Sequence, residues 1–119
     1  MMEIKRVYDA AQTGDGLRIL VDRLWPRGLS KEAARIDIWM KEVAPSPALR
    51  KWFGHDPERW EEFKRSYFLE LDASKEAVKE LEELIGIGSP ITLVYAAADP
   101  LHNNAVALRQ YLEFRASSP

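Results

Sequence analysis

Short runs of alternating or continuous apolar residues predict the strands of this chain. Residues 4–8 alternate apolar and charged side chains and predict a short strand, which a Thr-Gly-Asp-Gly turn follows. Residues 17–24 predict a second strand with apolar side chains on both faces. Residues 91–97 are also apolar on both faces, as in a central strand that is covered on both sides. The link over residues 9–16 is short for a parallel crossover, so the direction of the first strand stays open.

Apolar residues at helical spacing predict the helices of the second half. One stripe runs from Trp60 to Leu71 and another from Ala77 to a stop at Gly86, and both predict core-facing helices. A further helix is expected after the last strand. Three predicted helix starts have the same capping motif, in which a serine or aspartate at the cap precedes a proline: Ser46-Pro47, Asp56-Pro57 and Asp99-Pro100.

The segment between the second strand and these helices is less regular. Ser30 can cap a short helix that runs through Arg35. Residues 36–43 fit either a strand or one face of a helix, and the alternation of their apolar residues favours a strand. Strand-then-helix order predicts a single α/β domain over residues 1–119. We expect a small three-layer domain with a short, mostly parallel central sheet flanked by helices.

Composition excludes several classes of protein. The absence of cysteine rules out disulfides, thiolate nucleophiles and cysteine-ligated metals. The longest uncharged run, residues 85–98, is too short to span a bilayer, so we expect no membrane segment or signal peptide, and a cytoplasmic protein. The net charge of −2 argues against general nucleic-acid binding. Residues 1–55, however, contain ten basic and seven acidic side chains, which can form a local anion site.

Unusual polar segments follow the two strands that are expected to be most buried. Residues 22–28 are Asp-Arg-Leu-Trp-Pro-Arg-Gly, and residues 99–104 are Asp-Pro-Leu-His-Asn-Asn. Ligands of open α/β sheets lie beyond the carboxyl ends of the strands, so both segments would line one pocket if the strands are parallel neighbours. Its guanidinium groups and amides would suit a small anion, phosphate or carboxylate.

This hypothesis assigns a role to each polar residue of the two segments. His102 is the catalytic candidate, because an imidazole can transfer protons near neutral pH. Asp22 and Asp99 are catalytic candidates that could orient this imidazole. The anion-binding candidates are Arg23 and Arg27, with Trp25, Asn103 and Asn104 beside them.

Each of these residues also has a structural interpretation. Asp99 can simply cap a helix, and Asp22 can be the ion-pair partner of a neighbouring arginine. Trp25 can be a packing residue, and the two asparagines can serve the start of the helix. His102 can face solvent in the first turn.

A secondary candidate is the segment 50–56, Arg-Lys-Trp-Phe-Gly-His-Asp, at the corner between two predicted helices. His55 and Asp56 follow Gly54 there and could face the same pocket, although a tight interhelical turn explains most of this segment. With two histidines and no cysteine, the sequence assigns no metal site. It also contains no glycine-rich phosphate loop, so the cofactor is left unknown.

Three stretches resemble a known family. VDRLWPRG at 21–28, APSPALRKWFGHDPERWEEF at 44–63 and TLVYAAADPLHNNAVAL at 92–108 resemble the YeaO-like branch of the domain of unknown function 488 group. The resemblance extends from Arg6 to about Leu112 and implies a small α/β fold without naming a substrate. Related members of the wider group have a Cys-His-Arg segment where this chain has Leu-His-Asn-Asn. The missing cysteine and arginine argue against thiol-phosphatase-like chemistry here.

Two functional hypotheses follow. The first is an anion-binding protein that acts as an enzyme through His102. The alternative is a non-catalytic module that senses a metabolite or contacts a protein partner. Ligand identity and oligomeric state are left open.

Overall fold

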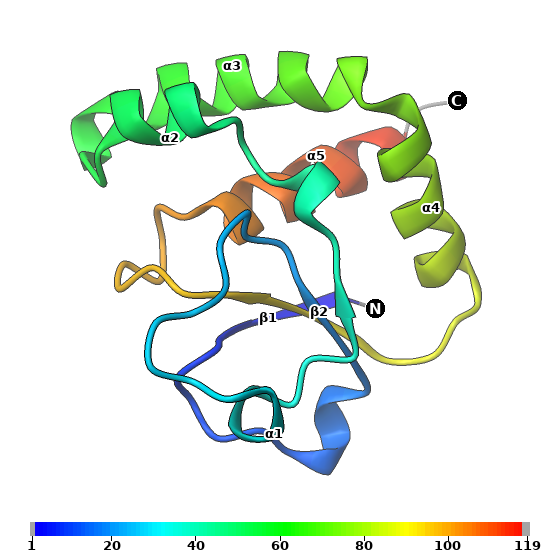
Figure 1. Ribbon diagram of the computed structural model, residues 1–119. Helices are drawn as coiled ribbons and strands as arrows, with labels where there is room; N and C mark the ends of the chain where they lie inside the picture. Colours follow the sequence, from blue (N-terminus) through cyan, green and yellow to red (C-terminus); the bar gives the residue numbers. More distant parts are fainter. Residues whose placement is uncertain (1, 118–119) are drawn as a thin grey trace.

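The computed structural model describes residues 2–117, which form four parallel strands and five α helices (Figure 1). The strands are β1 (Met2–Arg6), β2 (Leu17–Leu20), β3 (Ile38–Trp39) and β4 (Ile91–Tyr95). The helices are α1 (Lys31–Ala34), α2 (Pro47–Phe53), α3 (Trp60–Ala73), α4 (Lys75–Gly86) and α5 (Asn104–Ser117). Three short 3-10 helices are η1 (Thr13–Asp15), η2 (Lys41–Val43) and η3 (Pro57–Arg59). The expected α/β fold with a parallel sheet is confirmed.

The strand order explains how a short link can join two parallel strands. The order is β1-β4-β2-β3, so β4 lies between β1 and β2 and pairs with both in parallel. A strand of five residues is about 16 Å long, whereas a link of ten residues can span about 33 Å. Residues 7–16 can therefore return to the amino end of the sheet without a crossover helix, and the direction of the first strand is settled as parallel.

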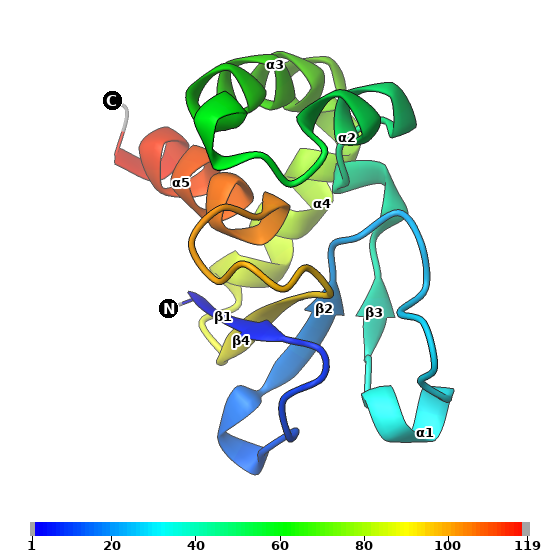
Figure 2. The same ribbon diagram turned by 90° about the vertical axis from the view of Figure 1, so that its left-hand side faces the viewer.

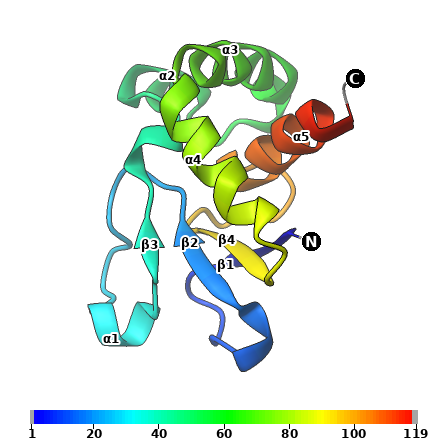
Figure 3. The ribbon, with the colours of Figure 1, turned by 90° about the vertical axis from the view of Figure 1, so that its right-hand side faces the viewer.

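The two faces of the sheet are covered unequally. Helices α2 to α5 lie on one side, with α5 between the sheet and α3 (Figures 1 and 2). Figure 3 shows α4 running from the end of α3 towards the start of β4. On β4, Leu93 belongs to the large core under these helices, and Val94 belongs to a smaller cluster on the other face, under α1 and the connecting segments. Apolar residues on both faces of β4 are therefore buried.

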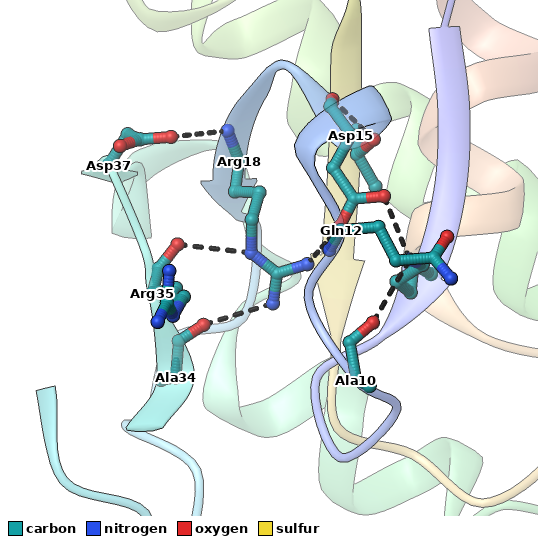
Figure 4. A network of polar contacts seen from close by, with 9 residues as sticks. Ala10, Gln12, Asp15, Arg18, Ala34, Arg35 and Asp37 are labelled. Carbon is teal, nitrogen blue, oxygen red and sulfur yellow. Dashed lines mark hydrogen bonds and ion pairs between the residues drawn. The ribbon is translucent and has the colours of Figure 1, made fainter. Parts of the chain in front are cut away.

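A buried ion-pair network connects β1 to the amino end of β2. Arg18 Nη1 lies 2.7 Å from Asp15 Oδ2, and its other nitrogens donate to the carbonyls of Ala34 and Arg35 (Figure 4). Lys5 Nζ on β1 lies 2.8 Å from the second Asp15 oxygen. Burial alone would raise the pKa of Asp15, but hydrogen bonds from Lys5, a main-chain amide and Arg18 outweigh it and lower this pKa. The network is structural and is centred on Asp15, in the turn that precedes β2.

Several strands are shorter than the apolar pattern predicts. β2 ends at Leu20 and β4 at Tyr95, because the following residues turn into loops. The segment 36–43 forms a strand over only two residues and then a 3-10 turn, since its pairing with β2 stops after the Met40 amide donates to the Leu20 carbonyl. Ser30 caps α1 as predicted.

Two of the three predicted proline starts are confirmed. Ser46 caps α2, and Asp56 caps η3, which leads directly into α3. The predicted start at Asp99 is wrong. Its carboxylate accepts hydrogen bonds from two following amides in a local turn, and the Asn103 side chain then caps α5 by accepting from the Val106 amide.

Candidate functional site

A pocket of about 550 Å³ opens beyond the carboxyl ends of β2 and β4. Its floor is formed by the loops after these strands, and α2, α3 and the start of α5 supply the remaining walls. Figure 2 shows α2 and α3 beyond the ends of the strands. Because β2 and β4 are parallel neighbours, Asp22 and Asp99 follow their strands at the same edge, as the sequence predicts.

Asp22 joins the two strand ends and the last helix. Its Oδ2 accepts a hydrogen bond from the Ala96 amide at 2.9 Å, and its Oδ1 accepts from Asn104 Nδ2 at 3.0 Å. Burial raises the pKa of Asp22, although these two hydrogen bonds and the positive charges of Arg50 and His55 oppose the shift. Both carboxylate oxygens therefore have protein donors, which makes Asp22 first of all a positioning group.

Three arginines bring positive charge to the pocket. Arg23 is half-buried, and its Nε and Nη2 each donate at 3.2 Å, to the carbonyls of Pro45 and Ala44 respectively. Arg27 and Arg50 are exposed at the rim. Within residues 2–117 the guanidinium groups of these two rim arginines have no hydrogen-bond or ion-pair partner. Arg23 thus supports the loop before α2, whereas Arg27 and Arg50 can turn towards a ligand.

Both histidines of the chain line the pocket. His102 Nδ1 lies 2.9 Å from Asp99 Oδ2, so the carboxylate orients the imidazole. The hydrogen bonds of the Leu101 amide and of His102 hold the pKa of Asp99 below its usual value. Asp99 itself does not line the pocket, and its carboxylate is connected to the pocket through His102.

His55 reaches the pocket from the corner after α2. Gly54 ends this helix in the left-handed region, and His55 follows it with a φ of 57°. Left-handed backbone is uncommon for residues other than glycine and is often found at functional positions. The neighbouring Asp56 does not line the pocket, because its carboxylate caps η3 and lies near Arg59.

The structural interpretation holds for two of the anion-binding candidates. Trp25 lines the pocket, but its Nε1 donates to the Leu29 carbonyl and its ring packs edge-on against Trp39. Asn103 is buried and serves as the cap of α5. Asn104, in contrast, contacts Asp22 directly and connects α5 to the end of β2.

The secondary candidate segment included Arg50 and Phe53, but only its histidine and aspartate were expected at the pocket, and α3 was not expected there at all. Arg50 and Phe53 from α2 line it together with Phe63 from α3. Arg50 and Phe53 are three positions apart, so they share the helix face that leads into the corner at Gly54. In the sequence, the three-residue spacing of Arg50 and Phe53 next to a histidine was the signal that could have placed both residues at the pocket. Only the packing of α2 over the strand ends could show that this face points into the pocket.

Two kinds of feature are absent from the part of the chain that the structure describes. Residues 2–117 contain no group of three or more histidine, aspartate or glutamate side chains that could hold a metal ion. None of the helices in the same range is both long and apolar enough to cross a membrane.

The fold and the pocket define a small parallel α/β protein with a basic, partly aromatic cavity at the strand ends, and comparison with known proteins gives its family. Residues 1–118 match the family described as the inactive DUF488-N3 subclade, and the chain belongs to this family. The resemblance to YeaO-like proteins is confirmed.

Similar proteins span almost the same length. An uncharacterised protein of Mycobacterium tuberculosis is 43% identical over 114 residues, which cover 96% of this chain and 95% of the relative. The uncharacterised protein YeaO of Escherichia coli is 41% identical over 111 residues, which cover 93% of this chain and 96% of YeaO. No solved structure matches the chain.

Proposed function

We propose that the protein binds a small anion, a phosphate or a carboxylate, in the pocket beyond β2 and β4. One observation carries this proposal: the pocket gathers three arginines and both histidines around a single carboxylate. These residues are Arg23, Arg27, Arg50, His55, His102 and Asp22. In a chain of net charge −2, this is a local excess of positive charge. We expect the ligand to be a cytoplasmic metabolite, in line with the composition.

The two arginines at the rim of the pocket support the proposal that the ligand is an anion. The guanidinium groups of Arg27 and Arg50 make no hydrogen bond or ion pair with any residue between 2 and 117, so the five N–H donors of each are available. A guanidinium can bind a carboxylate or a phosphate through two parallel hydrogen bonds. Either rim arginine can bind an anion in this way.

The composition of the pocket favours binding over turnover. Among its described lining residues there is no serine, threonine, cysteine or lysine to act as a nucleophile. Asp22 already accepts a hydrogen bond at each oxygen. The description of the family as an inactive subclade agrees with a non-catalytic module.

A second candidate function rests on the pairing of His102 with Asp99. A carboxylate 2.9 Å from Nδ1 fixes the orientation of the ring, which is the arrangement of a general acid or base. Acid/base catalysis on the bound anion is therefore the alternative to simple binding.

The binding proposal is tested by calorimetric titration with inorganic phosphate, sulfate and small carboxylates. In Arg27→Gln/Arg50→Gln we expect affinity to fall about tenfold or more, because each charge-assisted hydrogen bond contributes about 1.5–3 kcal/mol. Arg23 is left intact, since it supports the carbonyls of Ala44 and Pro45. The matched control Arg65→Gln/Lys79→Gln removes the same charge from exposed positions on α3 and α4 and should bind normally. Equal loss in both double variants would contradict a local site.

Turnover is tested separately with His102→Gln. If screening finds a reaction on a phosphorylated or carboxylated metabolite, this variant should lower kcat by about a hundredfold or more, with a smaller change in affinity. The binding module predicts no product with either protein and a weaker affinity of the variant for the same ligand. Product formation by the wild-type protein would contradict the binding-module hypothesis and support the enzyme hypothesis.

A further inference from the structure

Among the described residues that line the pocket, Asp22 is the only one with a carboxylate. Three arginines and both histidines line the same pocket. Burial raises the pKa of Asp22, and the positive charges of Arg50 and His55 oppose this rise, so both groups act on the carboxylate. Within residues 2–117, however, Asp22 forms no ion pair. One negative charge and several positive charges therefore line one pocket without direct contact between them.

The carboxylate of Asp22 keeps unused capacity to accept hydrogen bonds. Its two oxygens offer about four acceptor positions. One position on each oxygen is filled, by the Ala96 amide on Oδ2 and by Asn104 Nδ2 on Oδ1. Asp22 is partly exposed and lines the pocket, so a donor group in the cavity can reach this carboxylate.

This carboxylate restricts which anions the arginines can bind. An anion without a hydrogen atom, such as sulfate, brings its oxygens close to a second negative charge and offers it no donor. Like charges placed close together weaken binding. An anion that carries a donor group can instead form a hydrogen bond with Asp22, and such a bond to a charged acceptor is stronger than one between neutral groups. Asp22 thus favours an anion with a donor.

The donor that suits this pocket is a hydroxyl group. An ammonium group could also donate to Asp22, but it would lie among three arginines, which repel another positive charge. A hydroxyl group is neutral and donates its hydrogen without this repulsion. The volume of about 550 Å³ leaves room for an anionic group and a hydroxyl group beside it.

We infer that the ligand is an oxyanion with a hydroxyl group, a hydrogen phosphate or a hydroxy carboxylate, whose hydroxyl donates to Asp22 while a rim arginine binds its anionic oxygens. This inference rests on the proposed anion binding and adds the chemical class of the ligand. Asp22 is then a specificity-determining residue in addition to its positioning role.

The first test compares three dianions of similar size at pH 8. Hydrogen phosphate carries a hydroxyl group, fluorophosphate has fluorine in its place, and sulfate has neither. Their dissociation constants are measured by calorimetry with the full chain. We expect hydrogen phosphate to bind about tenfold or more tightly than the other two, because only hydrogen phosphate can donate to the carboxylate.

The second test distinguishes the two sources of the hydroxyl group. It compares glycolate with acetate, and 3-hydroxypropanoate with propanoate, so that two separations of hydroxyl and carboxylate are covered. A preference for the hydroxyl-bearing partner only among the dianions identifies a hydrogen phosphate, and a preference only among the carboxylates identifies a hydroxy carboxylate.

The failures of the two proposals are distinguishable. Equal affinities within every set of probes would overturn the hydroxyl requirement and leave the anion site standing. The absence of binding by every anion would overturn the anion site itself. Glycine serves as the ammonium-bearing probe, and tighter binding of glycine than of glycolate would assign the donor to an ammonium group and contradict the inference.

Asp22→Asn separates selection of the ligand from a purely structural role. This variant removes the negative charge and adds a donor, so sulfate should bind more tightly and the preference for the hydroxyl-bearing anion should be lost. A purely structural role would weaken all anions together and keep the preference, which would overturn the role of Asp22. Asp9→Asn removes the same charge from an exposed residue outside the pocket lining and should keep the preference. If Asp22→Asn does not fold, the comparison of hydrogen phosphate with fluorophosphate on the wild-type chain still tests the inference.

Discussion

The Nδ2 atom of Asn104 lies 3.0 Å from the Oδ1 atom of Asp22, although 82 positions separate the two residues in the chain. The same nitrogen also donates to the carbonyl of Val21 at 2.9 Å. The first residue of α5 is thereby attached to the end of β2. This contact holds two walls of the pocket at a defined separation, and the buried carboxylate is its centre.

Replacing Asp22 with Asn should destabilise the fold. The carboxylate accepts from two donors, whereas an amide offers one oxygen and would turn its own NH₂ towards either the Ala96 amide or Asn104. Because one of the two donors would lose its acceptor, we expect the free energy of unfolding to fall by about 1–3 kcal/mol. Urea denaturation measures this, with the exposed Asp9→Asn as control.

The deficit of Asp22→Asn should shrink as the pH rises. The pKa of Asp22 is raised above 3.8 by burial, so the folded state binds this proton more tightly than the unfolded chain. The contribution of Asp22 to stability is therefore full below the unfolded pKa and is lost as the pH rises through the folded pKa. A deficit that grows between pH 4 and pH 7 would contradict a raised pKa.

Replacing Gly16 and Gly14 with alanine should change the stability of the protein in opposite directions. Gly16 has a φ of 66° and a ψ of −137°, and an added Cβ would lie 2.2 Å from the Pro90 carbonyl oxygen, which accepts from the Leu17 amide. We expect Gly16→Ala to lose about 3 kcal/mol or more, because backbone strain and a main-chain clash combine.

Gly14→Ala is the control for this strain. An added Cβ meets no atom within 4 Å in the η1 turn, so lower entropy of the unfolded chain should stabilise the protein by about 0.4–1 kcal/mol. Urea denaturation of both variants gives the comparison. Similar losses at the two positions would show that the approach to Pro90 is not the cause.

Asp15→Ala should be far more damaging than the loss of a surface ion pair. It leaves Arg18 buried at 4% exposure without its carboxylate partner, which should cost about 3–5 kcal/mol. Glu82→Ala removes the partner of Arg115 at the surface and should cost about 0–1 kcal/mol. The urea midpoints of the two variants measure the difference between their losses of stability. Equal losses would contradict the idea that burial makes the Asp15 network more important than a surface ion pair.

Local rules determined a substantial part of this protein from its sequence. The caps at Ser30, Ser46 and Asp56 depend on hydrogen bonds that reach two or three residues along the chain, so they could be predicted without the fold. The buried strand β4, within the predicted range 91–97, followed from apolar side chains on both faces. That strand, with residues 17–24, also indicated one shared edge for Asp22 and Asp99.

Tertiary structure decided what the local pattern left open. The position of β4 between β1 and β2 is a long-range pairing, which no local propensity specifies. The turn at Asp99 depends on where β4 ends, and it moved the start of α5 to Asn104. Arg50 and Phe53 became pocket residues only because α2 packs over the strand ends. Contacts within four residues are encoded locally, whereas the site depends on which distant segments the core brings together.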